Sequence, residues 1–183
     1  MSADSTWARI ARRLDPIAIW SGRLVCLLLV PLVLALTWEV VARYVFNAPT
    51  MWAYDMTFIL YGSFFMLGAA FTLQRKGHVR TDMYYDRWPP RRQAVIDLVC
   101  YLVIFFPFVS VFVVSGWEYF VKAYAMNERF VSSTWQPVTW PFKLSMPVAG
   151  VLLLVQGVSE CCKCMHTLLR GEWPDERKVE FQA

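Results

Sequence analysis

The chain is poor in charged residues, and four of its stretches contain almost none. Asp, Glu, Lys and Arg make up 17% of its 183 residues, whereas 57% are hydrophobic. The charge-poor stretches are 24–42, 56–73, 98–117 and 144–159. Each approaches the roughly 20 residues that an α-helix needs to cross a ~30 Å hydrocarbon core. This composition argues against a soluble domain and predicts an all-α membrane protein with four transmembrane helices.

Cysteine and histidine are also scarce, which argues against several kinds of site. The five cysteines lie inside predicted spans or at the inner end of the fourth, so reduced thiols are expected and no disulfide framework. A thiol oxidoreductase needs paired cysteines on the oxidising side, and none are there. The group Cys161, Cys162, Cys164 and His166 matches no usual zinc spacing. We therefore expect no metal and no cofactor.

The positive charges are distributed unevenly along the chain. Of the 18 Lys and Arg residues, 14 precede the first stretch, separate the second from the third, or follow the fourth. Loops rich in Lys and Arg face the cytoplasm, so both termini are predicted to be cytoplasmic. The net charge of +4 follows from this topology and does not indicate a nucleic-acid partner.

The sequence is expected to divide into three parts. Residues 1–18 are predicted to form a short cytoplasmic amphipathic helix, residues 19–167 the transmembrane domain, and residues 168–183 a cytoplasmic tail. The four spans are placed at about 22–43, 54–74, 93–120 and 142–165. No cleaved signal is expected, because the first span is long and no small-residue cleavage site follows it.

The predicted N-terminal helix carries apolar residues at helical spacing and basic residues largely on its other side. Trp7 belongs to the apolar side, and the basic residues are Arg9, Arg12 and Arg13. Such a helix lies at the membrane interface and is held by apolar burial and anionic lipid, so membrane lipids are expected partners. The pair Asp15-Pro16 is expected to end it.

Prolines and small residues predict how the spans bend and pack. Pro31 and Pro107 fall inside the first and third spans, and a mild kink is expected at each. The helical pattern of the third span extends from Pro90 to about Met126. Small residues gather on the second and fourth spans and predict close helix contact: Gly62, Ser63, Gly68, Ala69, Ala70, Ala149, Gly150 and Gly157.

Three charges stand out at the predicted outer side. Glu39 and Arg43 are four residues apart at the end of the first span, and Asp55 opens the second with Trp52 just before it. An acid four residues before a base shares a helix face with it and can pair. Charges at membrane depth usually face protein or a watery cavity. The group fits a structural pair between helices, a contact with a partner subunit, or substrate binding.

A second polar string lies where the second span reaches the cytoplasm. It contains Gly77, His78, Arg80 and Asp82. Gly77 fits a helix C-cap, and His78 and Asp82 are spaced to pair in a following turn. The string is interpreted as a structural cap and turn, with a catalytic His–Asp pair as the alternative.

Together these residues resemble the small membrane subunit of tripartite ATP-independent periplasmic (TRAP) transporters, the DctQ-like family. The matching pieces are 43–47 (RYVFN) followed by Trp52 and Asp55, then 68–70 (GAA), 77–82 (GHVRTD) and the Trp- and Pro-rich 132–147. Asp55 departs from the family, which more often has Glu there. The resemblance covers the chain from the first span through the fourth.

The resemblance implies a small, non-catalytic scaffold subunit in the bacterial inner membrane. Its implied partners are a large DctM-like membrane subunit, which carries substrate and sodium, and a periplasmic substrate-binding protein. The implied cargo is a small carboxylate-bearing solute. The alternative reading is a haem- or quinone-binding anchor subunit of a respiratory enzyme. Its only candidate haem ligands are His78 and His166.

Overall fold

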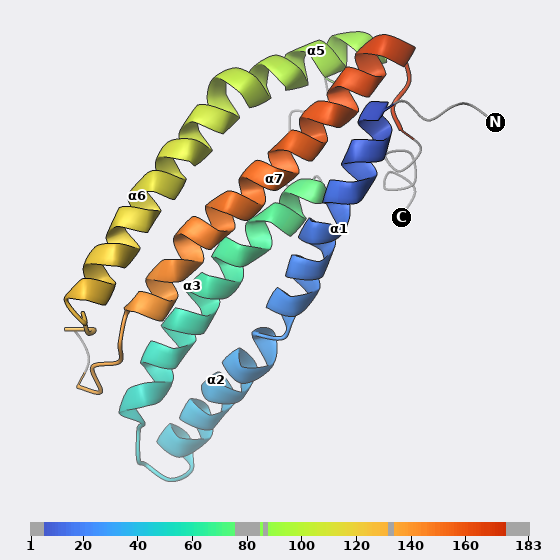
Figure 1. Cartoon of the computed structure of the whole chain (residues 1–183). Coiled ribbons are helices and arrows are strands. Elements are labelled where there is room, and N and C mark those ends of the chain that lie inside the picture. The colour runs from blue at the N-terminus through green and yellow to red at the C-terminus, as the bar shows by residue number, and fades with distance from the viewer. Residues whose placement is uncertain (1–5, 76–84, 86–87, 132–133, 175–183) are drawn as a thin grey trace. The chain divides into compact units, whose positions relative to one another are not determined.

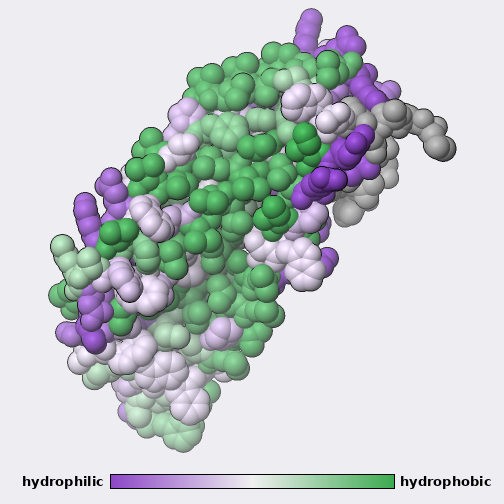
Figure 2. Space-filling view, in the orientation of Figure 1, coloured by the Kyte–Doolittle hydropathy of each residue, from purple (hydrophilic) through white to green (hydrophobic). Residues whose placement is uncertain are grey.

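The computed structural model describes residues 6–75, 85, 88–131 and 134–174, and their regular structure is helical (Figure 1). Four helical segments are long and apolar enough to cross a membrane, which confirms the predicted all-α architecture. They are Thr6–Tyr44, Met51–Gln74, Pro90–Ala125 and Trp140–Arg170. On the face shown in Figure 2, the surface along the helices is mostly apolar and hydrophilic side chains gather toward helix ends. The side of the membrane that each end faces stays a prediction.

The helical segments contain seven named elements. The first segment consists of α1 (Thr6–Cys26) and α2 (Leu29–Tyr44), and the second is α3 (Met51–Gln74). The third runs without interruption through α5 (Pro90–Cys100), the π-helical turn η1 (Tyr101–Phe105) and α6 (Phe106–Ala125). The fourth is α7 (Trp140–Arg170). The third helix thus covers nearly the whole range expected from the sequence.

The chain forms two compact units. Of the described residues, the first unit takes 6–20, 70–75, 85, 88–111 and 151–174, so it contains most of α1, all of α5 and η1, and the C-terminal part of α7. The second takes residues 21–69 and 112–150, so it contains α2, most of α3, most of α6 and the start of α7. Both units are built from helices that the sequence separates widely.

In the first unit, α1 packs through a face of small residues. Ala8, Ala11, Asp15 and Ala18 recur at intervals of three and four residues, and each is at most 5% exposed. Small side chains let two helices approach closely, and Figure 1 shows α1 beside the C-terminal half of α7. The apolar side that includes Trp7 is exposed instead. The helix therefore has three faces: small and packed, apolar and exposed, and basic.

The expectation that Asp15-Pro16 ends this helix is wrong. The helix α1 continues through Pro16 to Cys26. Pro16 lies on the exposed side of α1, so its ring does not disturb the packed face. Asp15 is buried on the other side. Membrane helices tolerate such prolines when the surroundings satisfy the freed carbonyl.

The two prolines that were expected to kink the first and third spans, Pro31 and Pro107, each follow a local change in helical hydrogen bonding. Proline has no N–H and clashes with the carbonyl four residues earlier. For Pro31 that carbonyl belongs to Leu27, where the chain makes a tight turn between α1 and α2 and Val30 N–H bonds to Leu27 O instead, at 3.3 Å. For Pro107 it belongs to Val103, in the middle of the π-helical turn η1. Where a mild kink was expected, the helix therefore has a turn before Pro31 and a π-helical turn before Pro107.

Three of the predicted glycines make close helix contacts. A Cβ atom built on Gly62 would lie 2.5 Å from the Phe142 ring, and one built on Gly150 would lie 2.5 Å from Val113. In the first unit, a Cβ on Gly157 would lie 2.5 Å from the Phe105 ring. The expectation is wrong for Gly68, where a Cβ would meet no atom within 4 Å. Glycine therefore serves packing within the chain at three positions and not at the fourth.

We predict that Gly157→Leu lowers the stability of the purified chain. The added side chain would overlap the Phe105 ring, and overpacking of this kind costs roughly 1–3 kcal/mol or more. Thermal unfolding in detergent, followed by circular dichroism, measures the change. The matched control is Gly68→Leu, because an added Cβ at Gly68 meets no atom within 4 Å. Equal midpoints for the two variants would contradict the prediction.

Candidate functional site

The connection between α2 and α3 is held by a single carboxylate. Glu39 Oε1 accepts hydrogen bonds from Arg43, at 3.1 Å from Nε and 2.5 Å from Nη2. Glu39 Oε2 accepts the Thr50 N–H at 3.0 Å and also the Thr50 hydroxyl. The expected pair is therefore present, and Thr50, which the sequence analysis missed, joins it. One side chain on α2 thus fixes the residue that precedes α3.

The exposed part of this connection is basic and aromatic. The Arg43 side chain is 55% exposed, whereas that of Glu39 is 13% exposed. Trp52 is 39% exposed on the first turn of α3, and Asp55, one turn later, is 6% exposed. The expectation that Asp55 belongs to the same group as Glu39 and Arg43 stays a prediction. The connection therefore exposes the Arg43 guanidinium and part of the Trp52 indole, whereas the Glu39 carboxylate is largely covered.

A second ion pair joins the end of α6 to the start of α7. Lys143 Nζ lies 2.6 Å from a carboxylate oxygen of Glu128 and 3.6 Å from the centroid of the Tyr119 ring. Thr139 donates to the Glu128 carbonyl through its N–H and through its hydroxyl, each at 3.0 Å. These contacts hold the residues after α6 against the first turn of α7.

The most buried polar group lies in the first unit, between α1 and α7. Lys163 Nζ is 2.8 Å from Asp15 Oδ2 and 2.8 Å from Glu160 Oε1. Ser159 donates its hydroxyl to Asp15 Oδ1 at 2.5 Å. The Gln156 amide lies 3.2 Å from Asp15 Oδ1 and 3.3 Å from Glu160 Oε1. We name these five residues the α1–α7 cluster.

The cluster is shielded from the surroundings. Gln156 and Ser159 are 0% exposed, Glu160 is 1%, Asp15 is 5% and Lys163 is 8% exposed. Ions removed from water lose several kcal/mol of hydration, so they persist inside a protein only when paired and hydrogen-bonded. Because one end of each contact to Asp15 belongs to α7, the cluster fixes α1 against α7.

The sequence analysis missed the cluster, although a signal was present. Gln156, Ser159, Glu160, Lys163 and Thr167 recur every three or four residues and form one polar stripe on α7. In a helix that is otherwise apolar, such a stripe indicates a polar contact with another helix. Its partner was not readable, because Asp15 had been interpreted only as the end of a helix.

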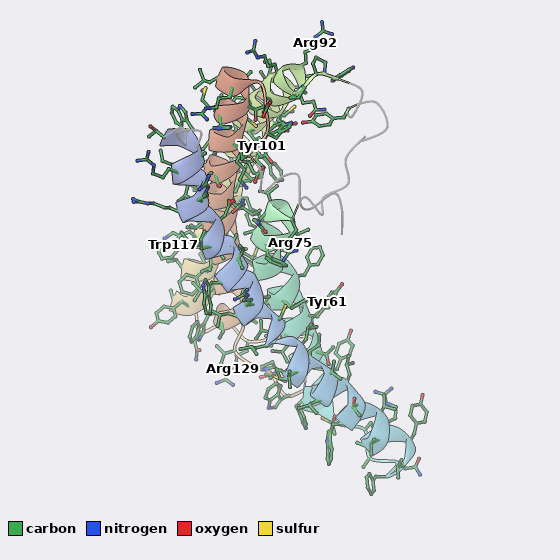
Figure 3. All side chains as sticks on the ribbon, turned by 90° about the vertical axis from the view of Figure 1, so that its right-hand side faces the viewer. Tyr61, Arg75, Arg92, Tyr101, Trp117 and Arg129 are labelled. Carbon is green, nitrogen blue, oxygen red and sulfur yellow. The ribbon has the colours of Figure 1, made fainter. Side chains whose placement is uncertain are left out.

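The remaining candidate residues are spread over the first unit. Trp7 is 40% exposed, and the three arginines of the basic face are exposed as well: Arg9, Arg12 and Arg13. Figure 3 shows Arg92 at the start of α5 pointing outward. The predicted cytoplasmic motif lies outside the described residues: Gly77, His78, Arg80 and Asp82.

The cysteine group on α7 is largely buried. Cys162 and Cys164 are buried, Cys161 is half-buried, and none of them is in a disulfide. His166 is 8% exposed. Within the described ranges, no three His, Cys, Asp or Glu residues are arranged to hold a metal ion.

Comparison with known proteins assigns a family. The family model described as "Tripartite ATP-independent periplasmic transporters, DctQ component" matches residues 32–166. The sialic acid TRAP transporter small permease protein SiaQ of Vibrio cholerae is 22% identical over 144 residues, which cover 78% of this chain and 79% of that protein. The family match includes Glu39, Arg43 and Lys163, and it begins after α1.

We predict that Lys163→Met destabilises the purified chain more than Arg43→Met does. Removing one partner of a buried ion pair costs about 3–5 kcal/mol, because charge is left buried without its partner. The Arg43 guanidinium is exposed, and an ion pair in contact with solvent is screened and contributes little to stability. Thermal unfolding of both variants in the same detergent measures the difference. A larger loss in Arg43→Met would show that the α1–α7 cluster does not stabilise the fold.

Proposed function

We propose a scaffolding role for this chain, which belongs to the DctQ component family of tripartite ATP-independent periplasmic transporters. As a small permease subunit it is a multi-pass membrane protein. The observation that carries the scaffolding role is that its lysine ion pairs connect separate parts of the helical fold. The pairs of Lys163 and of Lys143 join one helix or connection to another. Contacts that fix helices against each other are expected in a rigid supporting subunit, rather than in a subunit that moves or catalyses a reaction.

The partners and cargo follow from the family. In this proposal, a large DctM-like membrane subunit carries the solute with sodium, and a periplasmic binding protein delivers it. The complex works in the bacterial inner membrane, and the small subunit is not an enzyme. The relative from Vibrio cholerae is named for sialic acid, which bears a carboxylate. This name supports a small organic acid as the class of solute.

The connection between α2 and α3 is the proposed contact for a periplasmic partner. The distribution of Lys and Arg predicts that this connection faces outward. It presents Arg43 and Trp52, and arginine and tryptophan are enriched at the centres of protein interfaces. On the opposite side, the basic face of α1 is proposed to contact anionic lipid through Arg9, Arg12 and Arg13.

The alternative function, a haem- or quinone-binding anchor, is not favoured by the family match. Haem ligation would need His78 and His166 on either side of one porphyrin. His166 is buried on α7, and His78 lies outside the described residues. The absorbance spectrum of the purified protein separates the two functions, because a haem protein has a Soret band.

We predict that the chain co-purifies with a DctM-like subunit and is required for sodium-dependent uptake. Affinity purification of the tagged chain from membranes that co-express both subunits tests the association. Uptake is measured in proteoliposomes with the binding protein and the solute that this protein captures, identified beforehand by thermal shift. Full sodium-dependent uptake by the large subunit alone would contradict the scaffolding role.

We predict that Arg43→Glu lowers uptake because it places two carboxylates side by side and reverses the charge of the exposed group. The double variant Glu39→Arg with Arg43→Glu restores an ion pair with inverted orientation. If Arg43 contacts the periplasmic partner, the double variant stays impaired and binds that partner more weakly in a pull-down. Wild-type uptake by the double variant would limit the pair to a structural role, and wild-type uptake by Arg43→Glu would exclude both roles.

A further inference from the structure

The start of α5 and the end of α7 lie side by side in the first unit (Figure 1). A single side chain, Gln93, joins them. Its amide nitrogen donates to the carbonyls of Tyr85, at 3.0 Å, and Trp88, at 3.1 Å. Its amide oxygen accepts the indole N–H of Trp173 at 3.1 Å. Gln93 therefore fixes residues that precede α5 and a residue that follows α7 in one place.

The two helix ends are in direct contact at Gly171. This glycine follows α7 with a φ of +78°, and its N–H donates to the Thr167 carbonyl at 2.7 Å. A Cβ atom built on it would lie 3.3 Å from Arg91 Nε and 3.8 Å from Arg91 Cζ. The Arg91 guanidinium therefore lies beside the last turn of α7, where positive charge offsets the negative end of the helix dipole. We name residues 88–93 and 170–173 the α5–α7 corner.

Three arginines of the α5–α7 corner are exposed. Arg91 and Arg92 lie in the first turn of α5, and Arg170 is the last residue of α7. Figure 3 shows Arg92 pointing outward. The corner also contains one exposed acid, Glu172, so three positive charges stand against one negative charge. Like charges held close together repel each other, and an anion bound among them relieves this repulsion.

The length of α7 places the corner at the level of the lipid headgroups. The 31 residues of α7 extend about 46 Å at 1.5 Å per residue. A bilayer measures roughly 40–45 Å when its headgroup layers are included. The helix therefore reaches from one headgroup layer to the other, and Arg170 lies at the level of one of them. Trp88, which is 42% exposed, agrees with this depth, because tryptophan is enriched there.

We propose that the α5–α7 corner binds the phosphate of an anionic phospholipid, with Arg91 and Arg92 as its main contacts. The guanidinium group presents a planar fork of N–H donors that matches a phosphate group. A soluble phosphate compound offers the same chemistry, but the depth of the corner favours a lipid. A zwitterionic headgroup has no net charge and gains less from a corner of net positive charge. This site is separate from the basic face of α1 and requires only the membrane-spanning fold, not the scaffolding role.

Native mass spectrometry of the purified full chain measures how tightly it holds single lipids. The chain in detergent is titrated with dioleoylphosphatidylglycerol and separately with dioleoylphosphatidylcholine, which has the same acyl chains and no net charge. We expect the double variant Arg91→Gln with Arg92→Gln to bind the anionic lipid about five-fold more weakly per arginine, the effect of one basic residue at an anionic surface. The matched control is Lys122→Gln with Arg129→Gln, which removes the same charge from exposed positions of the second unit.

Two further arms keep the result interpretable. The titrations are repeated in an Arg9→Gln, Arg13→Gln background, so that the basic face of α1 does not mask a loss at the corner. Each variant is also unfolded thermally with and without lipid, because the shift within one variant reports binding even where the substitution changes stability. We expect phosphatidylglycerol to raise the midpoint of the control and not that of the double variant.

Three outcomes would overturn the proposal. Wild-type affinity for phosphatidylglycerol in the Arg91→Gln, Arg92→Gln variant would show that the corner does not bind the lipid. Equal losses in the Lys122→Gln, Arg129→Gln control would show that net charge alone matters. An equal midpoint shift with glycerol 3-phosphate, which carries a phosphate and no acyl chains, would assign the corner to a soluble phosphate compound instead of a lipid.

Discussion

The structure depends on one constraint, which is that hydrocarbon offers no hydrogen-bond partner to a polar group. Hydroxyl groups inside helices meet this constraint locally: Thr57 donates to the Ala53 carbonyl at 2.8 Å, and Ser145 to the Phe142 carbonyl at 2.6 Å. A buried charge needs an oppositely charged partner, and both Lys163 and Lys143 pair with a carboxylate outside their own helix. The α1–α7 cluster and the Lys143–Glu128 pair are the results, so the need to satisfy charge determines which helices are joined.

The same constraint explains which contacts the sequence predicted. The Glu39–Arg43 pair is four residues apart on one helix, so local spacing was sufficient to predict it. Thr50 was missed because its contact with Glu39 depends on how the connecting residues turn. The hydrogen bond between Ser159 and Asp15 joins residues 144 positions apart. Local spacing could not predict it, because it depends on the packing of α1 against α7.

Residue size, rather than hydrophobicity, decides which face of a helix packs against the protein. The sequence predicts an apolar and a basic face for the N-terminal helix, yet the packed face of α1 contains Ala8, Ala11 and Ala18. Between two helices in a membrane there is little hydrophobic driving force, because lipid is as apolar as the protein. Close approach of small residues and the buried polar contact of Asp15 then dominate. Pro16 does not interrupt this helix because both interactions lie on its opposite side.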